Sequence, residues 1–181
     1  SVVSVTDLSN NLQIDYKDVK LDGNRSILIT EKVSANGLQT SYTFDVDDDN
    51  KSDFARSSDI RFNADRSSVE TFREPYQANA AVYGTYGAKK VVYSGITTRA
   101  ANGLQSVTQI DADGNGVFDA TTTDTTTIGV DGSRSSQSET LYADGTLRSR
   151  FETTVSADGR QTVSIADYDG NGIADKISDS R

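Results

Sequence analysis

The chain contains 181 residues, of which 27 are Asp or Glu and 18 are Lys or Arg, so its formal net charge is −9. This negative charge argues against binding to nucleic acid and against attraction to anionic membrane surfaces. Cys and His are absent, which excludes disulfides, thiolate or imidazole metal sites, and catalytic triads built on either residue. Only 34% of the residues are hydrophobic, so we expect a thin core and a second source of stability.

The first 33 residues, 1–33, are predicted to be the end of a preceding repeat, and they contain the turn signal Asp22-Gly23. Three segments that align with one another without a gap follow at 34–53, 100–119 and 156–175. Each of them runs from an Asn-Gly or Asp-Gly turn to an acidic stretch of nine residues. Because the turn and the acidic stretch keep the same separation every time, the pattern indicates tandem structural repeats.

The spacing of these segments sets the predicted domain organisation. The first full repeat covers 34–99 and contains a ten-residue insertion near 75–90, since its acidic stretch lies ten residues further from the next one than in the following interval. The second repeat covers 100–155, and 156–181 begins a third. Neighbouring repeats are expected to stack into one continuous folded unit, and the chain is expected to be a fragment of a longer array.

Between the turns lie segments of seven to ten residues rich in Thr, Val, Ile and Ser. In 145–155, Phe151 and Val155 alternate with Arg150 and Glu152, which is the period of a strand with one buried face. Asp-Gly and Asn-Gly favour positive φ and two-residue hairpin turns. The sequence therefore predicts an all-β fold, an antiparallel meander of about four strands per repeat and about twelve in all. The meander is expected to form an elongated sheet, a sandwich or a solenoid, with the acidic loops between its strands.

The acidic stretches place oxygen-bearing side chains at alternate positions. In "DADGNGVFD" at 111–119, aspartates and an asparagine occupy positions 1, 3, 5 and 9, and a glycine occupies position 6. Calcium prefers six to eight oxygen ligands, and a glycine at position 6 allows a sharp turn after which position 7 offers its carbonyl. Asp, Asn and Gly are also ordinary turn formers, but a turn needs only one or two of them. We therefore predict about three calcium ions, one in each loop.

The predicted calcium ligands stand at positions 1, 3, 5, 7 and 9 of the three loops. In loop one (45–53) they are Asp45, Asp47, Asp49, Lys51 and Asp53. In loop two (111–119) they are Asp111, Asp113, Asn115, Val117 and Asp119. In loop three (167–175) they are Asp167, Asp169, Asn171, Ile173 and Asp175.

Position 7 is expected to contribute a backbone carbonyl, which leaves the side chain of Val117 free to pack inward. Loop one carries Asn50 where the other loops have glycine, and Asn tolerates the same left-handed conformation. A further oxygen is expected from water or from Asp124 or Asp158. Without an ion the three carboxylates of each loop repel one another, and a divalent cation reverses the sign of that interaction. Calcium is therefore the expected second source of stability.

The loops resemble the D-x-D-G-N-G-x-x-D calcium loops of EF-hands, dockerins and thrombospondin type 3 repeats. The glutamate that EF-hands carry at position 12 is replaced by Arg56, Thr122 and Ser178. Over its whole length the chain is similar to the calcium-binding tandem repeats of large bacterial type I-secreted (RTX-type) surface proteins. That resemblance implies a secreted or cell-surface location and neighbouring repeats of the same chain as partners. It also implies a structural module that folds or rigidifies on extracellular calcium.

The segment 73–93 holds the only proline and four of the eight tyrosines. An alternative function is therefore a calcium-dependent ligand-binding module, lectin-like or adhesin, whose tyrosine-rich insertion contacts carbohydrate or a host surface. The same segment could instead fold back over the sheet. The chain shows no catalytic motif, so we expect no enzyme activity, and we expect neither a nucleic-acid partner nor insertion into a membrane.

Overall fold

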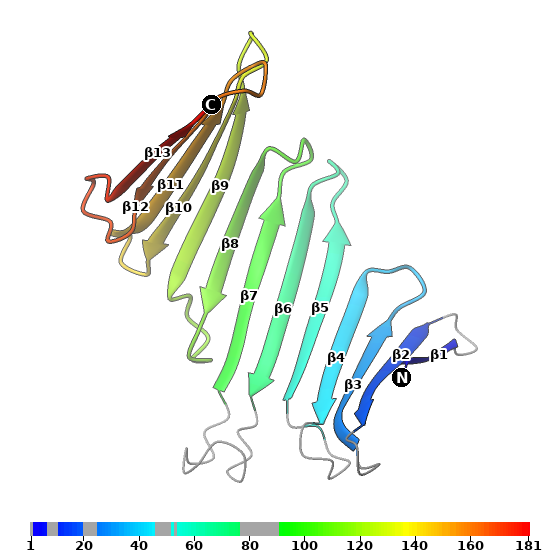
Figure 1. Cartoon of the computed structure of the whole chain (residues 1–181). Coiled ribbons are helices and arrows are strands. Elements are labelled where there is room, and N and C mark those ends of the chain that lie inside the picture. The colour runs from blue at the N-terminus through cyan, green and yellow to red at the C-terminus, as the bar shows by residue number, and fades with distance from the viewer. Residues whose placement is uncertain (1, 7–10, 20–24, 46–51, 53, 77–90) are drawn as a thin grey trace. The chain divides into compact units, whose positions relative to one another are not determined.

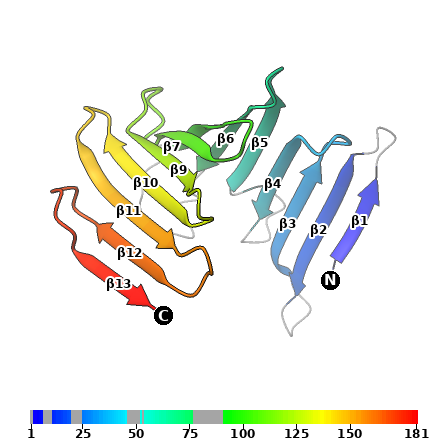
Figure 2. The same ribbon diagram turned by 90° about the horizontal axis from the view of Figure 1, so that it is seen from above.

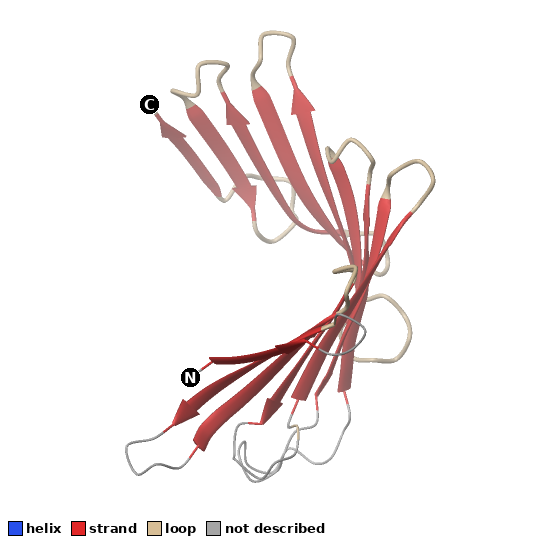
Figure 3. Ribbon diagram, turned by 90° about the vertical axis from the view of Figure 1, so that its right-hand side faces the viewer, coloured by secondary structure: helices blue, strands red, loops and turns tan. Residues whose placement is uncertain are grey.

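The computed structural model describes residues 2–6, 11–19, 25–45, 52, 54–76 and 91–181. Every secondary-structure element in these residues is a β-strand, and Figure 3 draws no helix among them. The described part of the chain therefore contains no helix long and apolar enough to cross a membrane. The thirteen strands are β1 (Val2–Thr6), β2 (Leu12–Val19), β3 (Arg25–Val33), β4 (Gln39–Asp45), β5 (Phe54–Phe62), β6 (Ser68–Tyr76), β7 (Val91–Arg99), β8 (Gln105–Asp111), β9 (Ala120–Ile128), β10 (Arg134–Tyr142), β11 (Leu147–Val155), β12 (Thr162–Asp167) and β13 (Lys176–Ser180).

The strands form one open sheet in which each strand is hydrogen-bonded to the strand that follows it in the chain (Figure 1). The pairs from β1 to β5 and from β8 to β13 are antiparallel. Figure 2 shows β10, β11, β12 and β13 running alternately in opposite directions. The prediction of an all-β antiparallel meander is confirmed, and of the three arrangements the sequence allowed, the strand order is that of a single sheet.

The chain divides into two compact units. The first comprises Ser1–Arg61, Glu70–Ser94 and Ala112–Asn115. The second comprises Phe62–Val69, Gly95–Asp111 and Gly116–Arg181. Strands β1 to β4 therefore belong to the first unit, and strands β9 to β13 with loop three belong to the second.

The strands recur at the same positions in each repeat. β4, β8 and β12 each end at the first aspartate of an acidic loop, namely Asp45, Asp111 and Asp167. Cross-strand polar pairs recur as well, since the hydroxyls of Thr97 and Thr108 lie 3.0 Å apart. One repeat later the hydroxyls of Thr153 and Ser164 lie 3.2 Å apart. The sequence repeat is thus also a repeat of strand position and side-chain pairing.

The three turns that precede β4, β8 and β12 share one geometry. In each of them the N–H of Gly37, Gly103 or Gly159 donates to the carbonyl of the residue three positions earlier, at 2.8 or 2.9 Å. The φ angles of these glycines are 70°, 69° and 71°. The N–H of Ser34, Ala100 or Ser156 also donates to the carbonyl of the residue five positions later. Four residues therefore lie between the bonded pair, two more than expected, and the glycine is the third of them, in the left-handed region. Arg66 adopts the same conformation, with φ 69°, without being glycine.

The sheet has almost no core in the residues described. Ala120 and Ala166 are the buried hydrophobic residues, and no large side chain is fully buried. Cross-strand pairing places Phe151 opposite Ser138 and Ala166, yet Phe151 remains 42% exposed. Its ring meets Tyr168 edge-on at 5.5 Å between centroids. The expected thin core is therefore confirmed, whereas the buried face predicted for this strand is not covered.

Candidate metal centre

Loops two and three each connect two adjacent strands and are closed at the base by a backbone hydrogen bond. In loop two the N–H of Asp119 donates to the carbonyl of Ile110 at 2.7 Å. In loop three the N–H of Asp175 donates to the carbonyl of Ala166 at 2.8 Å. This bond brings position 9 of each loop back beside the end of the strand on which position 1 stands.

The loop geometry gathers three carboxylates in each of these two places. Oxygen atoms of Asp111, Asp113 and Asp119 all lie within 4.8 Å of one another. The same holds for the equivalent positions of loop three, which are Asp167, Asp169 and Asp175. Each of the two clusters could hold a metal ion, and the structure thus brings together positions 1, 3 and 9 of the predicted sites.

The first aspartate of each loop is buried and fixed by backbone donors. Asp111 is 5% exposed and Asp167 is 6% exposed. The N–H of Gly116 donates to Asp111 Oδ2 at 2.8 Å, and the N–H of Gly172 donates to Asp167 Oδ2 at 2.9 Å. Both glycines adopt positive φ, 87° and 83°, which turns their N–H groups back toward the carboxylate. The glycine at position 6 therefore orients the first predicted ligand as well as turning the chain.

The ionised form of the Asp167 carboxyl is favoured although the side chain is buried. Burial alone would raise the pKa of this carboxyl, but the N–H groups of Gly172 and Gly170 and a hydrogen bond involving Asp169 favour the ionised form and lower the pKa below its ordinary value. The bond from Gly170 reaches Asp167 Oδ1 at 2.8 Å. Gly170 also packs closely against the backbone of Leu147, where an added Cβ would lie 2.2 Å from the carbonyl oxygen. An ionised aspartate at position 1 is the state that a cation requires.

The asparagine at position 5 has a different role in this geometry. In loop two the N–H and the side-chain amide of Asn115 donate to the two carboxylate oxygens of Asp113, at 3.1 and 3.0 Å. In loop three Asn171 donates to Asp169 in the same way, at 3.1 and 2.9 Å. The Oδ1 of Asn171 accepts the N–H of Ile173 at 2.7 Å. To ligate a cation as predicted, these asparagines would have to turn their oxygens toward the carboxylates.

Position 7 and loop one complete the account of the predicted ligands. Val117 and Ile173 carry exposed side chains, 63% and 71% exposed, so the side chain of Val117 does not pack inward. The physical reason is the absence of a second layer in the described residues, which leaves the loop with nothing to pack on.

In loop one, Asp45 is 5% exposed at the end of β4. The predicted ligands Asp47, Asp49, Lys51 and Asp53 lie outside the described residues.

The two side chains considered as sources of a further oxygen lie away from the acidic loops, Asp124 in the middle of β9 and Asp158 in the turn between β11 and β12. Asp124 pairs with Ser106 and accepts its hydroxyl at 3.1 Å. Five residues of strand separate Ser106 from Asp111, or about 17 Å. Asp158 accepts hydrogen bonds from Ser156 Oγ at 2.7 Å and from the Arg160 N–H at 3.1 Å, in the turn that precedes β12. Both predictions are wrong: Asp124 lies half a strand away from loop two. Asp158 lies at the opposite end of β12 from loop three, because antiparallel pairing places successive connections at alternate ends of the sheet.

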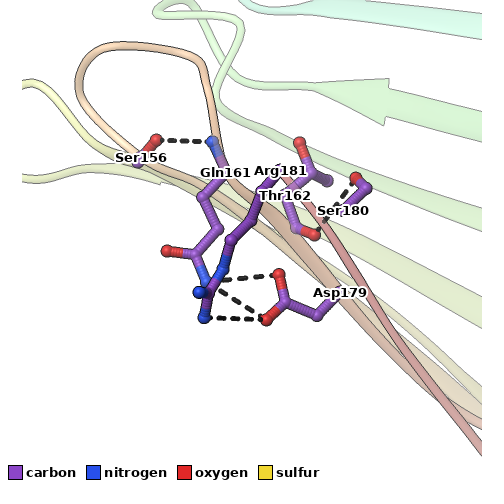
Figure 4. A network of polar contacts seen from close by, with 6 residues as sticks. All are labelled: Ser156, Gln161, Thr162, Asp179, Ser180 and Arg181. Atoms are coloured by element: carbon purple, nitrogen blue, oxygen red, sulfur yellow. Dashed lines mark hydrogen bonds and ion pairs between the residues drawn. The ribbon is translucent and has the colours of Figure 1, made fainter.

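Figure 4 shows that the carboxylate of β13 is also engaged away from loop three. Gln161 Nε2 donates to both oxygens of Asp179, at 3.2 and 3.3 Å, and an Arg181 guanidinium nitrogen lies 3.4 Å from Oδ2. Gln161 stands at the start of β12 and loop three at its end. Asp179 therefore stabilises the pairing of β12 with β13 rather than adding an oxygen to the cluster.

Loop three has a cationic neighbour that the sequence pattern does not reveal. Arg150 is the cross-strand partner of Asp167 and forms an ion pair with Glu139. The pKa of Arg150 is raised above its ordinary value, first by the hydrogen bond and charge of Glu139 and also by the negative charge of Asp167. The aligned position one repeat earlier is Ser94. A comparison of residues six positions before each turn would have singled out Arg150, but only the register places it beside a predicted ligand.

The donor set defines which metals these clusters suit. Carboxylate oxygens favour hard cations such as calcium, magnesium and manganese, and neither cluster contains a sulfur or imidazole donor. Exposed loops that supply three side-chain oxygens also leave room for water as a ligand, which both calcium and magnesium accept. Comparisons of the chain with protein-family models, with curated proteins and with solved structures found no match. The inference of function therefore depends on the residues themselves.

Proposed function

We propose that the chain is a calcium-binding structural repeat module of a large secreted bacterial protein, folding or rigidifying on extracellular calcium. The observation that carries this proposal is the recurrence of the carboxylate cluster at one structural position. Loops two and three both follow a strand that ends in a buried aspartate, four strands apart in the sheet. A position conserved through a repeat in this way is a property of the repeat unit, not of one surface loop.

Because the described part of the sheet has almost no core, a bound ion could contribute much of its stability. The described residues contain no large buried side chain, so apolar burial contributes little to the free energy of folding. Bound calcium would neutralise the carboxylates of each cluster and tie the ends of two strands together. Calcium is scarce in the cytosol and plentiful outside the cell. Loops of moderate affinity would leave the chain loose before export and stabilise it afterwards.

Thermal unfolding with and without calcium tests the proposal. With calcium at a hundredfold excess over its Kd, each occupied site stabilises the folded state by about 2.7 kcal/mol, or roughly 5 to 10 °C in melting temperature for a chain of this size. The measurement is circular dichroism during heating in calcium, in magnesium and in chelator. Equal melting temperatures in calcium and chelator would contradict the proposal, and equal effects of calcium and magnesium would contradict the choice of metal.

A calcium-dependent ligand-binding module remains the second candidate, and one observation favours it. β6 ends at Tyr76 and β7 begins at Val91, at the same end of the first unit as the junction of β4 with loop one. The tyrosine-rich insertion between them lies outside the described residues. If the insertion binds carbohydrate, replacing Tyr83 and Tyr86 with Ala should abolish binding on a glycan array and leave the calcium-dependent melting temperature unchanged.

A further inference from the structure

A hollow lies on one face of the first unit, formed by residues of β2 to β6. Its volume of about 590 Å³ lies within the range of small-molecule and cofactor sites. The residues that line it include Gln13, Lys32, Ser41, Ser57, Thr71 and Arg73. None of its lining residues belongs to an acidic loop or to residues 77–90 between β6 and β7, so the proposed calcium function leaves this hollow unexplained.

The polar side chains of the hollow share one face of the sheet. Gln13 pairs directly with Lys32, Lys32 with Ser41, and Ser41 with Ser57, and directly paired residues project to the same side. Thr71 and Arg73 of β6 project to this side too, because the residues that alternate with them contact the opposite face. There Glu70 accepts the Ser58 hydroxyl at 2.9 Å, and Glu74 lies 3.2 Å from the Arg56 guanidinium.

The balance of charge differs between the two faces. The charged residues lining the hollow are Lys32, Arg73 and Asp59. Asp59 accepts hydrogen bonds from Gln39 Nε2 at 2.7 Å and from Arg61 Nε at 3.1 Å, so its charge is compensated. The described residues behind the hollow instead carry Glu31, Glu70 and Glu74 against the single cation Arg56. On the side of the hollow Asp15 also accepts the Gln13 amide, at 3.3 Å. The described cations there, Lys32, Arg61 and Arg73, therefore exceed the carboxylates by one, in a chain of net charge −9.

The spacing of the two cations selects the kind of ligand. Lys32 stands on β3 and Arg73 on β6, three strands apart, or about 14 Å. If both side chains extend away from the sheet at this spacing, a polymer with charges at intervals can contact both at once. The lining between them supplies hydroxyls and amides but no aromatic ring. The strands from β2 to β5 are already paired on both sides, so a peptide would find no free strand edge to extend.

We infer that this hollow binds an acidic polysaccharide built of uronic-acid units. Its carboxylates contact Lys32 and Arg73, and its sugar hydroxyls exchange hydrogen bonds with Ser41, Ser57 and Thr71. Charge-assisted hydrogen bonds to the two cations supply much of the affinity.

Isothermal titration calorimetry with hyaluronan oligosaccharide tests this inference. The titrations use the full chain in saturating calcium, with a neutral maltodextrin of matched length as the comparison ligand. We expect the wild-type chain to bind hyaluronan and not maltodextrin. The double variant Lys32→Gln/Arg73→Gln should lose about tenfold or more in affinity, and binding should weaken in high salt.

A matched variant separates the hollow from a general effect of charge. Arg134→Gln/Arg160→Gln removes the same two charges from the second unit and should bind hyaluronan as the wild-type chain does. Circular dichroism of both variants checks that they fold. No hyaluronan binding by the wild-type chain, or an equal loss in the two double variants, would overturn the inference. Binding that disappears in chelator while Lys32→Gln/Arg73→Gln binds normally would overturn it too, because the carboxylates would then be held by ions in the acidic loops.

Discussion

Aspartates beside glycine occur in two settings in this sheet, and the comparison shows what makes a metal site. In the short turns, Asp131 and Asp144 are exposed, and each accepts hydrogen bonds from the N–H and hydroxyl of the residue two positions on, Ser133 and Thr146. In loop two the first aspartate, Asp111, is buried and has two further carboxylates within 4.8 Å. A turn satisfies its single carboxylate from its own backbone, whereas an acidic loop gathers more negative charge than its donors can balance.

The largest expected effect is on calcium binding, when an aspartate of an acidic loop is removed and an aspartate of a short turn is removed for comparison. Asp111→Ala should abolish calcium binding by loop two, because it removes the buried ligand around which the loop is arranged. Calorimetry should then show one ion fewer per chain, and the calcium-induced rise in melting temperature should shrink. Asp144→Ala provides the matched control and should bind as many ions as the wild-type chain. An unchanged ion count in Asp111→Ala would contradict the assignment of loop two.

Acid should affect both settings in the absence of calcium. Hydrogen bonds from Ser133 and Thr146 lower the pKa values of Asp131 and Asp144 in the folded chain, and the N–H groups of Gly172 and Gly170, opposing burial, lower that of Asp167. A carboxyl whose folded pKa lies below its unfolded value, about 3.9, contributes stability above that value, and this stability is lost as the pH falls through the folded pKa.

The melting temperature of the chelated protein should therefore hold steady down to about pH 4 and decrease below it. Thermal unfolding across an acidic pH series measures this. In Asp144→Asn the decrease should be smaller, since the amide no longer titrates. A melting temperature that rises on acidification would show that repulsion among the loop carboxylates outweighs the hydrogen bonds in both settings.

The two acidic loops should also differ from each other through Arg150. Its charge beside Asp167 competes with a cation for the same carboxylate. Arg150→Ser introduces the residue type of the aligned position Ser94 and should raise the calcium affinity of loop three about threefold to tenfold. Calorimetry that resolves the sites should show loop two unchanged, and Arg150→Lys should keep the wild-type affinity. A loss of affinity in Arg150→Ser would mean that Arg150 positions Asp167 instead of opposing the ion.

The sequence predicted the features that depend on local order along the chain. The offset from Gly37, Gly103 and Gly159 to each acidic loop fixed where strands end, and the strand order followed because short turns join neighbours. Features that depend on contacts across strands or between layers were not predictable in the same way. Alternation in 145–155 indicates two faces but not whether anything covers Phe151, which remains 42% exposed.

In the candidate metal site too, the features set by local spacing were predictable and those set by contacts between strands were not. Three carboxylates per loop follow from spacing alone, since a nine-residue loop closed at its base must bring positions 1 and 9 together. The errors concern Asp124 and Asp158, which are near the loops in sequence but lie in the middle of β9 and in the turn before β12. The contribution of Arg150 depends on register, which composition and periodicity do not determine.

The smallest expected effect lies in the turns, whose stability depends on backbone geometry alone. Arg66 adopts φ 69°, where the two turns with the same hydrogen-bond pattern have Gly132 and Gly145, at φ 87° and 83°. The left-handed conformation costs a non-glycine residue roughly 1 to 2 kcal/mol, and glycine loses roughly 0.5 to 1 kcal/mol more conformational entropy on folding. Arg66→Gly should therefore stabilise the chain by about 0.5 kcal/mol, or roughly 1 to 2 °C, equally in calcium and in chelator.

Gly145→Ala should lower the melting temperature instead. Gly145 has φ 83° with no atom close to an added Cβ, so the variant introduces backbone strain alone. If either shift depended on calcium, the turns and the acidic loops would be coupled, and the contrast between the two settings would be lost.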